Sequence, residues 1–104
     1  MNKVILIGRL GGDPELRYTR DQVAMARFSL ATSERIRTAE GEKEVRTDWH
    51  DIVIWGEQAE IAHKYLKKGR RVAVEGKIEY RDVKSKTGQK IRHMDIKVDR
   101  FEML

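Results

Sequence analysis

The sequence predicts an all-β fold, a barrel of five strands with one helix between the third and fourth strands. Apolar and polar residues alternate along most of the candidate strands, which is the period-2 pattern of a half-buried strand. Only one segment changes to the spacing of an amphipathic helix. That segment follows three strand patterns and precedes two, so the order of elements is itself a prediction of topology.

Three segments account for the first strands. Lys3–Leu10 is rich in β-branched residues and runs into a turn at Asp13-Pro14. Val23–Ala31 alternates, with Ala24 and every second residue after it on one face. Residues 33–47 are polar and predict a long loop or hairpin, and Asp48–Trp55 is the third strand.

The second half supplies the helix and two more strands. Gly56–Lys68 has helical spacing, and Gly69 stands where a helix C-cap glycine is expected. Arg71–Tyr80 returns to alternation, residues 82–90 form a polar connection, and Ile91–Met103 is the last strand. This order matches the OB-fold barrel, whose helix joins strands three and four. An SH3-like barrel lacks this helix, and a ferredoxin-like fold needs two helices.

Length and composition limit the kinds of protein that this sequence can encode. With 104 residues, the chain predicts one domain over 1–104. The 22 Lys and Arg outnumber the 17 Asp and Glu, so the net charge of +5 favours a polyanionic partner. The chain has no cysteine, no apolar run long enough for a membrane span and no signal-peptide pattern. We therefore expect a soluble, cytoplasmic protein without a membrane partner.

The residues give little support for an enzyme. His50, His63 and His93 fall on different predicted elements and lack any metal-ligand spacing. No nucleophile elbow, dinucleotide-binding motif or phosphate loop is present. We expect no catalytic residue, no metal and no cofactor.

Two tryptophans favour nucleic-acid binding. Trp49 and Trp55 are six residues apart on one strand, so both side chains point to one face, about 20 Å apart at roughly 3.3 Å per residue. Proteins that bind single strands place aromatic side chains for bases beside cations for phosphates. The alternative is that both indoles fill the barrel core or an oligomer contact. His50, Ile52 and Ile54 already supply a core face, which favours outward tryptophans.

The cations are spread along the chain rather than clustered. Residues 34–47 carry four cations against four glutamates, and residues 82–90 carry a net charge of +2. The densest basic run is Lys67 to Arg71, which fits phosphate contact and a solvated helix end equally well.

Six segments resemble the bacterial-type single-stranded DNA-binding proteins, in family order and over nearly the whole chain. These segments are Asn2–Tyr18, Phe28–Ser33, Thr47–His50, Trp55–Glu60, Tyr65–Gly69 and Val74–Ile78. The resemblance implies an OB fold, single-stranded DNA as ligand, and a homo-oligomer, commonly a tetramer built from dimers. It implies neither catalysis nor a metal.

The resemblance also implies roles for individual residues. Trp49 and Trp55 match base-stacking positions, and Tyr80 matches a position that is often aromatic. Lys68 matches a basic position near the binding path. The remaining expected nucleic-acid contacts are Arg17, Arg35, Arg37, Lys84 and Lys86. At the expected subunit contact are His50 and the first strand, with Asn2, Val4 and Leu6.

The chain departs from the family pattern in two respects. Ile36 and Val83 stand where well-known members stack bases on tryptophan. The absence of these two platforms predicts weaker or more salt-sensitive binding than in a tryptophan-rich member. Members usually carry an acidic C-terminal tail that docks replication and repair enzymes, whereas this sequence stops at Leu104. The resemblance is thus to a short form, either a truncated chain or a naturally short relative.

The expected function is sequence-independent binding and protection of single-stranded DNA in replication, recombination or repair. One alternative is a primosomal-type OB adaptor that chiefly binds proteins and has weaker affinity for single-stranded DNA or RNA. Another is an RNA-binding OB domain, which competition between ribo- and deoxyribo-oligomers would reveal.

Overall fold

The computed structural model describes all residues, 1–104, as strands wound into a barrel with a single helix. The elements are β1 (Val4–Leu10), β2 (Glu15–Tyr18), β3 (Ala24–Arg37), β4 (Lys43–Trp55), α1 (Glu57–Tyr65), β5 (Arg71–Lys84) and β6 (Lys90–Met103). The sheet order is β1-β5-β6-β4-β3-β2, and β1 also pairs with β3.

The strands β1 and β2 are two parts of one barrel strand. The end of β1 pairs with β3 at Leu10 opposite Leu30, and β2 continues along the same strand from Glu15 opposite Arg27. Between them the Gly11 amide donates to the Ser29 carbonyl at 2.9 Å. A short parallel contact between β4 and β6 closes the other side. The predicted five-stranded barrel, with a helix between its third and fourth strands, is confirmed.

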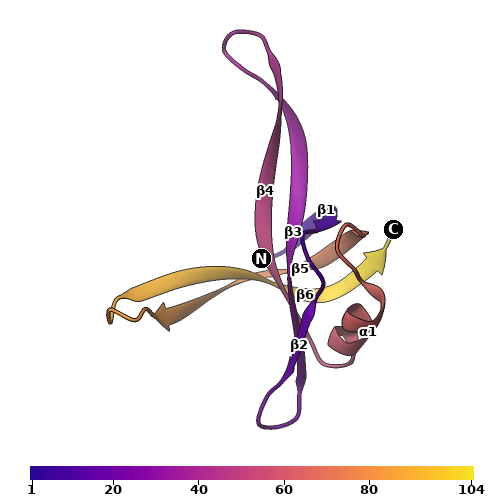
Figure 1. Ribbon diagram of the computed structural model, residues 1–104, viewed down its shortest axis with the longest axis vertical. Coiled ribbons are helices and arrows are strands. Elements are labelled where there is room, and N and C mark those ends of the chain that lie inside the picture. The colour runs from indigo at the N-terminus through magenta and orange to yellow at the C-terminus, as the bar shows by residue number, and fades with distance from the viewer.

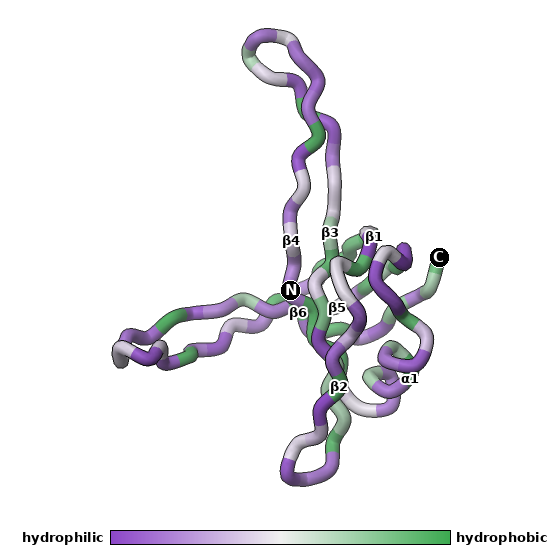
Figure 2. Tube along the Cα trace, viewed as in Figure 1, coloured by the Kyte–Doolittle hydropathy of each residue, from purple (hydrophilic) through white to green (hydrophobic).

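Two hairpins extend well beyond the barrel as long two-stranded arms (Figure 1). The β3–β4 arm turns at residues 38–42, and the β5–β6 arm turns at residues 85–89. Of the two forms expected for residues 33–47, a loop or a hairpin, the structure shows a hairpin that is paired almost to its tip. Residues 82–90 likewise prolong β5 and β6 to a short turn. Both arms are mainly hydrophilic (Figure 2), so they add surface rather than core.

The hydrophobic core fills the barrel and the space under α1. It follows the predicted alternation, since every second residue of β3 from Ala24 to Leu30 is buried. Fourteen buried side chains form one cluster, which includes Leu10, Ala26, Phe28, Leu30, Ile52, Ile54, Ala59, Ala62, Leu66, Val72, Val74 and Ile96. Because side chains alternate along a strand, the burial of these residues leaves the opposite faces of their strands exposed to solvent.

The helix ends earlier than the sequence predicts. Its C-cap is Leu66, in an extended conformation, so the prediction that Gly69 caps the helix is wrong. Gly69 instead has φ 86° in a turn, a conformation that suits a residue without Cβ. The Gly69 amide donates to the Leu10 carbonyl, and the Leu10 amide donates to the Arg70 carbonyl. The turn after α1 is therefore fastened to the end of β1. The nine residues of α1 are too few and too polar to cross a lipid bilayer.

Candidate nucleic-acid interface

The outer face of β3 and β4 carries both tryptophans. The strand register places Trp49 opposite Ala31 and Trp55 opposite Met25, so these side chains share one face. We call this face the outer wall; its residues are Met25, Arg27, Ser29 and Ala31 of β3 and Trp49, Asp51, Val53 and Trp55 of β4. Trp49 is 63% exposed and Trp55 is 36% exposed. Both indoles therefore present ring surface to solvent instead of filling the core.

Trp49 lies over the backbone of the link between β1 and β2. A Cβ at Gly11 would come within 2.4 Å of the Trp49 ring atom Cζ3, so only glycine leaves room for the indole in this position. The six-membered ring of the indole contacts the link at Gly11. The exposed remainder of the ring is available to a flat ligand.

Trp55 belongs to a different part of the outer wall. Arg17 of β2 is opposite Met25, and Met25 is opposite Trp55, so these three side chains form one row across three strands. The exposed Arg17 therefore stands two strands away from the exposed indole. This row combines a cation with an aromatic platform, as the sequence predicted for a single-strand binder.

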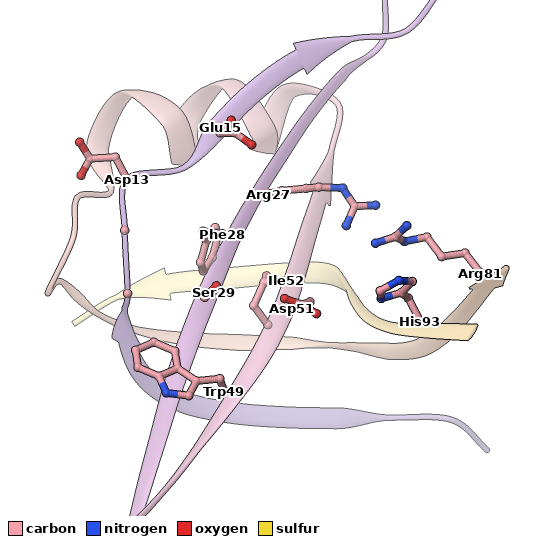
Figure 3. A pocket seen from close by; sticks show the side chains of 12 residues that line it. Asp13, Glu15, Arg27, Phe28, Ser29, Trp49, Asp51, Ile52, Arg81 and His93 are labelled. Carbon is pink, nitrogen blue, oxygen red and sulfur yellow. The ribbon is translucent and has the colours of Figure 1, made fainter. Parts of the chain in front are cut away.

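An open cleft of about 500 Å³ lies beside Trp49. The strands β4 and β6 pair only at Ile52–Ile96 and Val53–Lys97, and the arms separate beyond that point. Figure 3 shows Trp49 at one end of the cleft and Arg81 with His93 at the other. The cleft is lined by Gly11, Gly12, Asp13, Glu15, Arg27, Phe28, Ser29, Trp49, Asp51, Ile52, Arg81 and His93.

A buried carboxylate holds two arginines at this cleft. Asp95 of β6 is only 4% exposed. Its two oxygens accept hydrogen bonds from Nη1 and Nη2 of Arg27, each at 3.3 Å, and from Nε of Arg81 at 2.7 Å. Burial raises the pKa of Asp95, but the hydrogen bonds and charges of Arg27 and Arg81 outweigh it and hold the pKa below its ordinary value. The ionised carboxylate therefore ties three strands together.

The expected phosphate contact Lys68 lies next to the β1–β2 link. Its backbone amide donates to Oδ1 of Asp13 at 2.9 Å, which fixes the turn after α1 against the link. The guanidinium of Arg9 also donates to the Gly69 carbonyl at 3.0 Å. Lys68 is exposed and belongs to a turn that is hydrogen-bonded to the link. The same link contacts Trp49 at Gly11.

The remaining expected contacts lie on the arms. Arg35 and Arg37 fall on the β3 positions that continue the outer wall, whereas Lys84 and Lys86 are exposed at the end of the β5–β6 arm. Ile36 and Val83, the positions that lack tryptophan, are half-buried.

Tyr80 lies apart from the outer wall. Residues alternate along β5, so Tyr80 is on the opposite face of that strand from Arg81. The guanidinium of Arg92 lies 4.5 Å from the Tyr80 ring centre, a cation–π contact that covers one face of the ring. The structure thus brings Trp49, Trp55, Arg17 and Arg35 to one surface and leaves Tyr80 on another.

The first strand has an exposed edge and an exposed apolar face. Val4 and Leu6 pack against the core, whereas Ile5 and Ile7 are 65% and 51% exposed. The side chain of Asn2 both donates to and accepts from the backbone of Ile78, which extends the β1–β5 ladder by one more pair. His50 is half-buried, with Nε2 2.7 Å from the Thr32 hydroxyl oxygen.

The sequence did not single out Arg27, Arg81, His93 or Asp95 as site residues. The available signal was weak: Asp95 is a carboxylate between Met94 and Ile96 in a strand, and Arg27 is the one charged residue of the predicted strand Val23–Ala31. Their meeting depends on the pairing of β3, β4, β5 and β6. No three histidine, aspartate or glutamate side chains gather in a way that could hold a metal ion.

Comparison with known proteins decides the family. The model of the "Single-strand binding protein family" matches residues 1–104. The chain belongs to this single-strand binding protein family. A "Single-stranded DNA-binding protein" of Neisseria meningitidis is 46% identical over 104 residues, which are 100% of this chain and 60% of that protein. "Single-stranded DNA-binding protein 1" of Chlorobaculum tepidum is 45% identical over 105 residues, or 65% of its length.

A solved structure shares the fold of this family member. The "Plasmodium falciparum SSB complex with ssDNA" superposes with a TM-score of 0.88 and 34% sequence identity, covering 100% of this chain and 93% of that one. The chain spans about three-fifths of the length of the single-stranded DNA-binding proteins it matches. The names of these family members denote binding and not catalysis.

Proposed function

We propose that residues 1–104 form a single domain that binds single-stranded DNA without requiring a particular sequence. The observation that carries this proposal is the exposed indole of Trp49, seated on Gly11 beside an open cleft. Relatives with 45–46% identity are named for this activity. Such a domain would protect single strands during replication, recombination or repair, in the cytoplasm and on nucleoid DNA.

Binding on this surface combines two physical effects. Each base that stacks on an aromatic side chain contributes about 1–3 kcal/mol, and every base has a flat face, so stacking tolerates any sequence. Cations such as Arg17, Arg35, Arg37, Lys68, Lys84 and Lys86 contact phosphates and release counterions. The affinity should therefore fall steeply as salt rises.

We also propose that the protein acts as a homo-oligomer, a tetramer built from dimers. The support is the exposed edge and apolar face of β1, where Ile5 and Ile7 would be covered by a second copy. The expected contacts at Asn2, Val4, Leu6 and His50 stay part of this proposal. Replication and repair proteins are its further expected partners.

The experiment is a titration with poly-dT, followed by tryptophan fluorescence at two salt concentrations. We expect quenching of the indoles, and Trp49→Ala should weaken binding by about 1–3 kcal/mol for dT and dC oligomers alike. Tyr65→Ala is the matched control, because Tyr65 is an exposed aromatic residue on α1, away from the outer wall. An unchanged dissociation constant for Trp49→Ala would refute the stacking role, and tighter binding of ribo-oligomers would favour RNA as the ligand.

A further inference from the structure

We propose that the cleft between the diverging arms is a subsite for a single nucleobase, and that guanine is the base it prefers. This inference rests on the proposed binding of single-stranded DNA and goes beyond it, because sequence-independent stacking on Trp49 needs no such subsite. Trp49 opens one end of the cleft, and the arginines held by Asp95 occupy the other (Figure 3).

Arg81 has the donors that a base would need. Its Nε is committed to Asp95, which fixes the plane of the guanidinium, whereas neither terminal nitrogen has a hydrogen-bond partner in the structure. Arg27 gives both of its terminal nitrogens to the same carboxylate and neutralises it from the other side. The terminal nitrogens of Arg81 therefore form a fixed pair of parallel donors, which fits two adjacent acceptors.

The charge of the cleft disfavours a phosphate as the occupant. Besides Arg27 and Arg81, the lining carries the carboxylates of Asp13, Glu15 and Asp51, and Asp95 lies behind the arginines. Four carboxylates against two guanidiniums repel an anion that enters the cleft. A neutral ligand with both acceptors and donors uses the arginine and the carboxylates together.

Guanine has this combination of groups on adjoining edges. Its O6 and N7 are adjacent acceptors that match the paired donors of an arginine, the commonest specific arginine–base contact. Its N1–H and 2-amino group can donate to a carboxylate, and the side chain of Asp51 faces the same cleft without an ion pair (Figure 3). Trp49 is opposite Ala31 and Val53 is opposite Arg27, so the strand positions of Trp49 and Arg27 lie about 13 Å apart at 3.3 Å per residue. One base can stack on Trp49 while a neighbouring base enters the cleft.

The test compares short dT oligonucleotides that carry one central substitution. We expect the oligonucleotide with one dG to bind at least about five-fold more tightly than the all-dT strand. 7-Deaza-2′-deoxyguanosine lacks N7, and 2′-deoxyinosine lacks the 2-amino group, so each should reduce this preference. A preference for dA or dC instead, or equal binding of dG and dT strands, would overturn the guanine subsite.

Two variants locate the effect. Arg81→Lys keeps the charge but removes the planar pair of donors, so it should abolish the dG preference, measured within this variant as the ratio of the all-dT and dG dissociation constants. Asp95→Asn removes the carboxylate that holds the Nε of Arg81, so the ratio of all-dT to dG dissociation constants, measured in this variant, should fall toward one; an unchanged ratio would contradict the role of this carboxylate. Arg100→Lys is the matched control, since Arg100 also donates Nε to a carboxylate, that of Glu75, outside the cleft.

A dG preference that survives in Arg81→Lys would overturn the assignment to this cleft. Failure of the underlying function gives a different result. If neither the dG strand nor the all-dT strand binds, the proposal of single-stranded DNA binding fails, and the subsite fails with it. If both bind equally, only the subsite is refuted.

Discussion

At the scale of single residues, the candidate interface depends on a few specific contacts between neighbouring residues. The indole of Trp49 occupies space that any side chain at position 11 would take, so the ring and the glycine are one structural unit. The buried carboxylate of Asp95 likewise fixes the positions of Arg27 and Arg81. These two arginines are required in turn, because a buried charge is tolerated only when it is paired and hydrogen-bonded. No buried side-chain polar atom in the structure lacks a partner.

Asp95 also predicts how stability depends on pH. Its folded pKa lies below the ordinary value of 3.8, so folding favours the ionised carboxylate. The resulting contribution to the free energy of unfolding is complete above about pH 4 and disappears as the pH falls through the lowered folded value. Urea titrations between pH 5 and pH 2 should show this decline in the wild type and a flatter profile in Asp95→Asn. Asp99→Asn, at an exposed position outside any ion pair, should keep the wild-type profile.

The site residues that the sequence identified are related within one strand, whereas those it missed meet across several strands. The shared face of Trp49 and Trp55 follows from the period of one strand, which local sequence contains. The contact of residues 27, 81 and 95 spans three strands and depends on their register. Short-range patterns carry no information about that register, so only the fold brings this network into view.

At the scale of elements, the two arms differ in charge. Residues 34–47 balance four cations with four glutamates, whereas residues 82–90 carry Lys84, Lys86 and Lys90 against Asp82. Neither arm buries a face in the core, so the sequence showed polar connections there instead of strand alternation. The strand β2 was missed because its four residues are too few for a periodic signal and follow Pro14.

This asymmetry predicts that the β5–β6 arm provides more of the salt dependence of the proposed DNA binding than the β3–β4 arm does. The double change Lys84→Gln with Lys86→Gln should lower the slope of log affinity against log salt by about 1.4, at roughly 0.7 for each phosphate that is no longer neutralised. Titrations at several salt concentrations measure the slope. Lys64→Gln on α1 is the control, and an unaltered slope in the double variant would exclude this arm from the DNA path.

At the scale of the whole molecule, the barrel is small and its arms are long. The extents are 54 × 39 × 29 Å for a chain of 104 residues, so much of the surface belongs to projections. The order of strands and helix predicted this barrel correctly, because one helix after three strands leaves few alternative topologies. The length of the arms was not predictable from buried periodicity.

The exposed face of β1 predicts an assembly larger than one chain. Light scattering after gel filtration should give a multiple of 12.2 kDa for the wild type. The double change Ile5→Lys with Ile7→Lys should reduce the mass toward that of one chain, since charged residues on the covered face oppose association. Val23→Lys, at another exposed apolar position, is the control. A wild-type mass equal to one chain would contradict the proposed oligomer.

The parallel contact between β4 and β6 has a consequence for how the chain folds. It consists of two residue pairs and joins positions 52–53 to positions 96–97, whereas each long hairpin unites neighbouring stretches of sequence. Contacts between distant positions form slowly because a large loop must close first. During refolding, both hairpins should therefore assemble early. The β4–β6 contact should form late, together with the pairing of β1 and β5, which joins positions 4–9 to positions 71–76.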